Sequence, residues 1–220
     1  LVIKRMQLAE SRIKDEGHRF RFAISRGPLN IACYLMETTE FLTTLKVEPE
    51  KAHALLSIIT QFIEDWLSYQ RRCFPTIEGV MILDDIVGFL GPDDFLEFAH
   101  PYMTRLFSAQ DVPVKFFHND APCEVSAPYY SEWGVNLYNP GVQSSISEIF
   151  DMTKGKITIL GTIPPRDVMA DGSPKDIRRA TDKLLDLYKG NGRLILSTAG
   201  GMPPGVPTEN IEAMLRAIGA

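Results

Sequence analysis

The sequence has few cysteines, and their spacing matches neither a disulfide framework nor a redox pair. Its three cysteines, Cys33, Cys73 and Cys123, are odd in number and widely separated, with no CxxC pair. Thiols used in this way are typical of a reducing compartment. We therefore expect free thiols and a cytoplasmic location.

Two other features are missing, and each excludes a class of protein. The chain contains 23 Lys and Arg against 28 Asp and Glu, a net charge of −5, with no basic block. A nucleic-acid surface needs a basic stripe, so nucleic acid is not an expected partner. No apolar stretch approaches the roughly 20 residues that span a membrane, so no membrane-spanning segment is expected.

The length and composition predict one large core. A chain of 220 residues, 45% of them hydrophobic, is too short for two domains of ordinary size, so residues 1–220 are predicted to form a single domain. Six apolar strands are predicted, at 19–25, 79–83, 112–117, 135–138, 156–161 and 193–197. Helices are predicted between and around them, at 1–16, 29–36, 40–45, 49–70, 92–108, 144–153, 174–188 and 208–218. The 49–70 helix is expected to bury Phe62 and Trp66.

Strands that alternate with helices indicate an α/β fold with a parallel sheet and right-handed crossovers. Six units are two short of a (β/α)8 barrel of the TIM type. Most of the predicted strands run apolar and then turn polar or small, as in Val80-Met-Ile-Leu-Asp-Asp and Val135-Asn-Leu-Tyr-Asn. Barrel enzymes place their chemistry at these carboxyl ends. Ser25, Asp84 or Asp85, His118, Thr162 and Ser197 to Gly200 are therefore expected to line one cavity.

His118 and Asp120 are the strongest candidates for chemistry. They stand two residues apart across a strand end, so both side chains can point to one side. An imidazole and a carboxylate placed in this way bind Zn²⁺, or act as a base and its orienting partner; the plain alternative is a hydrogen-bonded loop cap. If a metal binds, Asp84, Asp85 and Glu124 are the further candidate ligands, while Cys123 is expected to be inert. Because adjacent residues at a strand end face opposite ways, at most one of Asp84 and Asp85 should enter the barrel mouth.

Five segments in order resemble the uroporphyrinogen decarboxylase superfamily, which holds porphyrinogen decarboxylases and methyltransferases that act with corrinoid (cobalamin) proteins. They are Gly27-Pro-Leu-Asn-Ile-Ala-Cys-Tyr-Leu, the stretch 84–98 with Pro101-Tyr102, His118-Asn-Asp, Gly161-Thr-Ile-Pro-Pro, and Gly201-Met-Pro-Pro-Gly-Val-Pro-Thr-Glu-Asn. The match begins at about the third strand of the family's barrel. The resemblance thus implies a barrel lacking its first two strands, completed by a missing N-terminal segment or by another chain.

The chain also departs from the family at its functional positions. Gly200 stands where the decarboxylases have a histidine and the thiol methyltransferases a zinc-binding cysteine, so the pocket there is expected to be open. Asp120 replaces the cysteine of the methyltransferases' His-x-Cys, and Asp85 replaces a decarboxylase serine. Only Tyr34 matches a decarboxylase functional residue directly.

The leading hypothesis is a corrinoid-linked methyltransferase that moves a methyl group between a small methylated compound and cobalamin. The resemblance then implies a corrinoid carried by a partner protein, and zinc held by His118 and Asp120. The catalytic candidates are His118, Asp120, Asp85 and Tyr34. The substrate-binding candidates are Asp84, Arg26, Thr162, Ser197 and Gly200.

Two alternatives remain. One is a cofactor-free decarboxylase of a tetrapyrrole or another polycarboxylate, for which Arg26 and Arg166 are the main cationic loop residues. The other is a non-catalytic binding module, in which Ala199-Gly200-Gly201 marks a lost site. Convergence of His118, Asp120 and one of the two adjacent aspartates on one pocket would separate the enzymes from the module.

Overall fold

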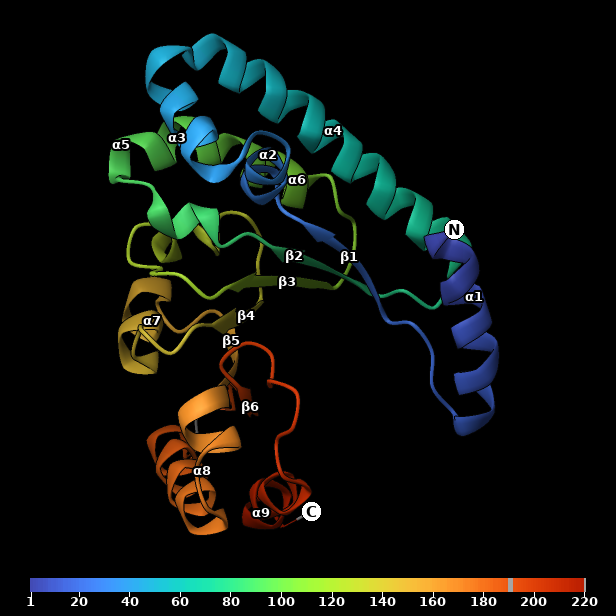
Figure 1. Ribbon diagram of the computed structural model, residues 1–220, viewed down its shortest axis with the longest axis vertical. Coiled ribbons are helices and arrows are strands. Elements are labelled where there is room, and N and C mark those ends of the chain that lie inside the picture. The colour runs from blue at the N-terminus through green and yellow to red at the C-terminus, as the bar shows by residue number, and fades with distance from the viewer. Residues whose placement is uncertain (190–191, 220) are drawn as a thin grey trace.

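The computed structural model describes residues 1–189 and 192–219, and its centre is one parallel sheet. The six strands lie in chain order: β1 (Phe22–Arg26), β2 (Gly79–Leu83), β3 (Val114–Asn119), β4 (Leu137–Pro140), β5 (Thr158–Ile163) and β6 (Leu194–Thr198). Every neighbouring pair is parallel, so all six carboxyl ends reach the same rim of the sheet (Figure 1). The predicted α/β architecture, six strands of a TIM-type barrel, is confirmed.

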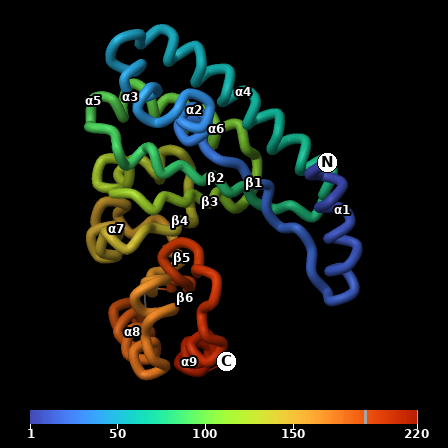
Figure 2. Tube along the Cα trace, viewed as in Figure 1, coloured from blue at the N-terminus to red at the C-terminus, as the bar shows by residue number. Residues whose placement is uncertain are grey.

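Helices connect the strands and lie along the sheet (Figure 2). They are α1 (Val2–Ile13), α2 (Pro28–Met36), α3 (Thr38–Val47), α4 (Pro49–Cys73), α5 (Pro92–Asp94), α6 (His100–Ser108), α7 (Ile146–Thr153), α8 (Pro174–Tyr188) and α9 (Thr208–Ala217). α1 buries none of its residues and projects away from the sheet, whereas α8 packs against β5 and α9 packs against α8. No helix among the described residues is both long and apolar enough to cross a membrane.

The helix predicted over 92–108 is interrupted by a π-helical turn at Phe95–Ala99, between α5 and α6. The N–H of His100 bonds to the carbonyl of Phe95, five residues back. Pro101 explains the change of pitch, because it has no N–H to offer to the preceding turn and its ring crowds that turn.

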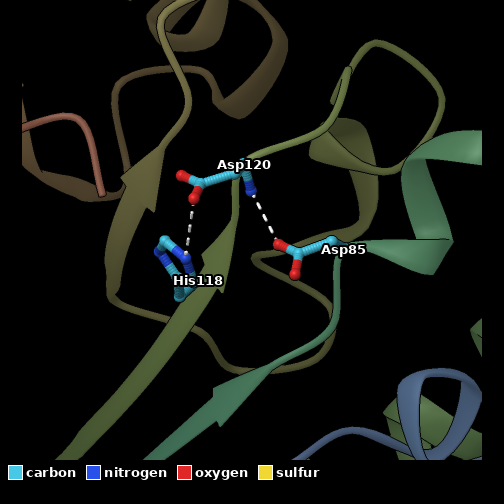
Figure 3. Close-up of side chains that lie close together, drawn as sticks. All are labelled: Asp85, His118 and Asp120. Carbon is cyan, nitrogen blue, oxygen red and sulfur yellow. Dashed lines mark hydrogen bonds and ion pairs between the residues drawn. The ribbon is translucent and has the colours of Figure 1, made fainter. Parts of the chain in front are cut away.

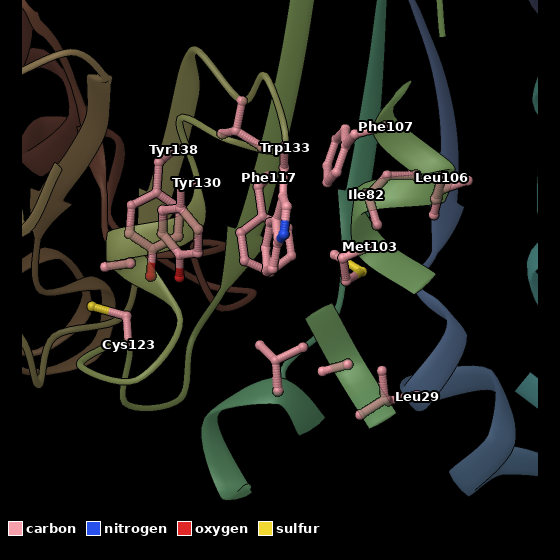
Figure 4. Packing of buried hydrophobic residues seen from close by; sticks show 14 of the residues in the cluster. Leu29, Ile82, Met103, Leu106, Phe107, Phe117, Cys123, Tyr130, Trp133 and Tyr138 are labelled. Carbon is pink, nitrogen blue, oxygen red and sulfur yellow. The ribbon is translucent and has the colours of Figure 1, made fainter. Parts of the chain in front are cut away.

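Aromatic side chains fill the core between β3, β4 and the outer helix layer (Figure 4). Trp133 is 1% exposed and packs against Phe107 of α6 and Phe117 of β3, with ring centroids 6.3 and 5.7 Å away. Trp133 thus lies between the sheet and α6, on the outside of the barrel. This packing anchors β3, the strand that carries His118, against the helix layer.

The apolar stripe predicted on α4 is wider than the face that the helix buries. Phe62 is 61% exposed and Trp66 is partly exposed, so the prediction that both belong to the core was wrong. The contact face of α4 runs instead through Leu56, Ile59, Ile63 and Leu67.

β1 is one edge of the sheet, and α4 occupies part of that edge. Gln70 of α4 accepts a hydrogen bond from the Ile24 N–H (3.0 Å) and donates one to the Ile24 carbonyl (2.9 Å), while the Trp66 indole N–H donates to the same carbonyl (3.2 Å). These side chains take the place of a neighbouring strand's peptide group, which shields an edge that would otherwise be open to pairing.

Candidate active site

The register of the parallel sheet brings the polar strand ends together. Leu83 of β2 pairs with His118 of β3, and His118 pairs with Asn139 of β4. The residues that follow β2 and β3 therefore leave the sheet side by side, at the rim where barrels carry their chemistry.

Asp85, His118 and Asp120 form one cluster at this rim (Figure 3). His118 Nε2 lies 3.4 Å from Asp120 Oδ2, and the Asp120 backbone N–H donates to Asp85 Oδ1 at 2.9 Å. The His118 side chain is 10% exposed, whereas that of Asp120 is 53% exposed. The cluster thus has a buried imidazole at its base and a carboxylate open to solvent.

The charges in the cluster favour a protonated imidazole next to ionised carboxylates. Burial by itself lowers the pKa of His118, but the hydrogen bond to Asp120 and the charges of Asp120 and Asp85 outweigh it, so the His118 pKa is raised. The hydrogen bond from His118 holds the pKa of Asp120 below its usual value against the effect of burial. Each residue therefore stabilises the charged form of the other.

Arg26 and Gly200 lie against the two carboxylates. Arg26, at the end of β1, places a guanidinium nitrogen 3.7 Å from Asp85 Oδ2. Gly200 follows β6 with a φ of +73°, and a Cβ added there would lie 2.7 and 2.9 Å from the Asp120 carboxylate oxygens. The space expected to be open at Gly200 is therefore occupied by the Asp120 carboxylate, and the positive φ favours glycine at this position.

Asp84 points the opposite way from Asp85, as strand alternation predicts. It is fully buried, and its two oxygens accept hydrogen bonds from the backbone N–H groups of Leu29 (2.9 Å) and Asn30 (3.1 Å) at the start of α2. Burial raises the pKa of Asp84, to about 8, against the effect of these bonds. A side chain enclosed in this way does not reach a substrate, so the role predicted for Asp84 is corrected to capping the N-terminus of α2.

The other predicted residues do not all join the cluster. Tyr34 is 67% exposed on α2, about 9 Å along the helix axis from Pro28. Thr162 lines a groove of about 580 Å³ between α7, β5 and α8, and Ser197 pairs with Thr162 in the sheet. Cys123 is buried and bonds to Ser144, whose hydroxyl donates to Glu124. Neither Cys123 nor Glu124 belongs to the cluster. The substrate roles of Tyr34, Thr162 and Ser197 stay predictions.

Asn139 is the residue that sequence reasoning missed. It is 6% exposed at the end of β4, and its side-chain oxygen lies 2.9 Å from His118 Nδ1. The sequence did contain a signal for Asn139, because the strand Val135-Asn-Leu-Tyr-Asn ends in this polar residue.

The donor set of the cluster fits a divalent cation. One ligand atom from each of Asp85, His118 and Asp120 lies within 4.8 Å of the other two, and this is the single such group in the described part of the chain. Two carboxylates and one imidazole can bind Zn²⁺ with an open position left for substrate. Oxygen-rich ligation is less selective for Zn²⁺ than thiolate ligation.

Comparison with known proteins places the chain in a family. The family model described as "Uroporphyrinogen decarboxylase (URO-D)" matches residues 6–220. The chain belongs to the uroporphyrinogen decarboxylase family. The resemblance stated from the sequence is confirmed.

Two curated relatives show how much of a family member this chain represents. The uroporphyrinogen decarboxylase of Thermodesulfovibrio yellowstonii is 25% identical over 196 residues, which are 86% of this chain and 56% of the relative. That of Xanthomonas oryzae pv. oryzae is 25% identical over 212 residues, covering 88% of this chain and 58% of the relative. The chain thus spans a little over half the length of these uroporphyrinogen decarboxylase-family proteins.

A solved structure supports the fold. A methyltransferase from Methanosarcina mazei superposes with a TM-score of 0.78 at 16% identity, over 89% of this chain and 57% of that protein. The arrangement of strands and helices is therefore shared with a methyltransferase, at an identity that shows the fold alone.

Proposed function

We propose that this uroporphyrinogen decarboxylase-family protein acts as a corrinoid-linked methyltransferase. The observation that carries the proposal is the convergence of Asp85, His118 and Asp120 at the carboxyl ends of β2 and β3. The partner is a corrinoid protein whose cobalt gains or gives the methyl group, and the small substrate is a methoxylated or methylamine-type compound.

The cluster's residues have distinct parts in this reaction. Asp85, His118 and Asp120 would hold Zn²⁺, which as a Lewis acid polarises the heteroatom that carries the methyl group. The carbon–heteroatom bond would break with its electron pair left on the heteroatom, and the reduced cobalt of the corrinoid partner would supply the electron pair of the new bond to the methyl group. Arg26 offsets part of the negative charge of Asp85, and burial keeps His118 away from bulk water. With no ion bound, the raised pKa of His118 supports proton donation to the leaving heteroatom.

The charge balance favours this substrate class over a polycarboxylate. Two carboxylates face the rim, and Arg26 near them is already paired with Asp85. With no metal bound, a substrate with several carboxylates would meet like charge from Asp120, which is half exposed and has a lowered pKa. A cation or a neutral methylated compound meets no such repulsion.

Decarboxylation of a tetrapyrrole or another polycarboxylate is the second candidate, because the curated relatives are uroporphyrinogen decarboxylases. In that case Arg26 and the exposed Arg166 would bind substrate carboxylates, with further cations from a segment outside these six strands. That segment, or another chain, would also complete the barrel between β6 and β1. At Ile24, it would have to displace Gln70 and Trp66 before pairing with β1.

A cobalamin absorbance assay tests the proposal. The full-length protein, a reduced corrinoid protein and a panel of methoxylated and methylamine donors should together convert the corrinoid spectrum to the methylated form. Uroporphyrinogen without cobalamin should release no carbon dioxide. Carbon dioxide release without any spectral change would overturn the methyltransferase proposal in favour of the decarboxylase.

A further inference from the structure

Asn139 makes three side-chain hydrogen bonds, to three different strands. Its Oδ1 lies 2.9 Å from His118 Nδ1 on β3, and its Nδ2 donates to the carbonyls of Leu160 on β5 (2.6 Å) and Thr198 on β6 (3.1 Å). An amide nitrogen has two hydrogens, so both are used.

These contacts define which way the amide faces. Carbonyl oxygens only accept hydrogen bonds, so the atom that faces Leu160 and Thr198 must be the NH₂ group. The flipped amide would place its oxygen against two carbonyl oxygens and leave three acceptors facing one another. The atom next to His118 is therefore the amide oxygen, which has no hydrogen to give.

The orientation of the amide determines the histidine. Because Asn139 Oδ1 only accepts, His118 Nδ1 must carry the hydrogen of this bond. In a neutral imidazole the other nitrogen, Nε2, is then bare, and its lone pair faces Asp120 Oδ2 at 3.4 Å. A lone pair facing a carboxylate is repulsive, so Nε2 next to Asp120 takes up either a proton, which gives the charged imidazole described above, or a metal cation.

We propose that Asn139 is the positioning residue that holds His118 in the Nδ1–H tautomer, so that Nε2 presents its lone pair to a divalent cation bound with Asp85 and Asp120. The inference rests on the proposed metal-dependent function for the part that concerns the cation. The part that concerns the tautomer rests on the hydrogen bonds alone. Asn139 itself touches no substrate and acts through His118, as the outer partner of a metal-binding histidine does.

The same side chain supports the other side of the cluster. Asn139 Nδ2 holds the Thr198 carbonyl, and the Thr198 hydroxyl donates to the Gly200 carbonyl at 2.6 Å. Gly200 lies directly against the Asp120 carboxylate. One amide thus fixes both the imidazole and the turn next to its carboxylate partner.

Cobalt binding tests the inference, with Co²⁺ as a coloured probe of the site in the full-length protein. Asn139→Ala should weaken Co²⁺ binding by about 10- to 100-fold, the usual effect of losing such an outer partner. Asn136→Ala is the matched control. Asn136 also makes two side-chain bridges, to the Lys115 N–H (3.0 Å) and the Pro113 carbonyl (2.7 Å), but at the opposite end of the same strands. The Co²⁺ affinity of the Asn136→Ala protein should stay within twofold of wild type. Equal weakening in both variants would overturn the inference.

The tautomer is measured separately by ¹⁵N NMR of labelled histidine, at a pH where the ring is neutral and with no metal added. Four histidines are present in the sequence, so the His118 signal can be assigned by its loss in His118→Gln. Wild type should show Nδ1–H at His118, and Asn139→Ala should shift the population toward Nε2–H. A wild-type ring with hydrogen on Nε2 would overturn the inference without any variant having to fold. Nδ1–H in a wild type that binds no Co²⁺ would support the tautomer assignment while contradicting the metal role in the proposed function.

Discussion

Replacing His118 with alanine is expected to lower methyl transfer by at least about 10²- to 10⁴-fold, while the protein stays folded. The substitution removes the nitrogen ligand of the cluster. It also leaves the carboxylates of Asp85 and Asp120 without the imidazole that offsets their negative charge. The corrinoid absorbance rate measures the loss, and circular dichroism with the melting temperature measures the integrity of the fold.

His18→Ala is the control for this experiment. His18 is an exposed residue before β1 whose ring makes no hydrogen bond among the described residues, so its loss should change neither rate nor melting temperature. A His118→Ala protein that turns over at the wild-type rate would remove His118 from the site.

The largest effect on stability is expected at Asp84. Asp84→Ala leaves the buried N–H groups of Leu29 and Asn30 without an acceptor, and each such group costs about 1–3 kcal/mol. The free energy of unfolding in urea should fall by about 3 kcal/mol or more. Asp93→Ala, at the exposed start of α5, removes an aspartate from another helix N-terminus and should cost less than about 1 kcal/mol.

Two glycines test the same interaction from the other side. Gly27 and Gly91 both precede a proline at a helix start in extended backbone. A Cβ at Gly27 would overlap the Asp84 carboxylate, whereas a Cβ at Gly91 meets nothing within 4 Å. Gly27→Ala should therefore destabilise the protein by about 1–3 kcal/mol more than Gly91→Ala. Equal losses of stability in the two variants would mean that the close approach of Asp84 to the start of α2 does not contribute to the stability of the protein.

The strands and their rim were predictable because each strand is a local pattern. The apolar runs that end at Leu83, Phe117 and Leu196 fixed where the sheet stops, and parallel pairing then placed their polar neighbours at one rim. His118 and Asp120 were found in the same way, since residues two apart share a face of a strand.

The rest depended on contacts between distant segments. Alternation predicted that Asp84 and Asp85 diverge, but the place where α2 begins, some 55 residues earlier, decides which of them is buried. Gly200 was interpreted as an empty position because nothing local shows that Asp120, 80 residues earlier, fills the space beside it. The role of Asn139 depends on carbonyls of β5 and β6 that only the folded sheet brings within reach.

The position of a bound zinc ion tests the central claim most directly. Crystals of the full-length protein, loaded with Zn²⁺ and measured on both sides of the zinc absorption edge, should show an anomalous peak about 2.0–2.2 Å from His118 Nε2 and from carboxylate oxygens of Asp85 and Asp120. An absence of zinc at these three residues, or a zinc ion bound only elsewhere on the chain, would contradict the metal site on which the proposed methyl transfer rests.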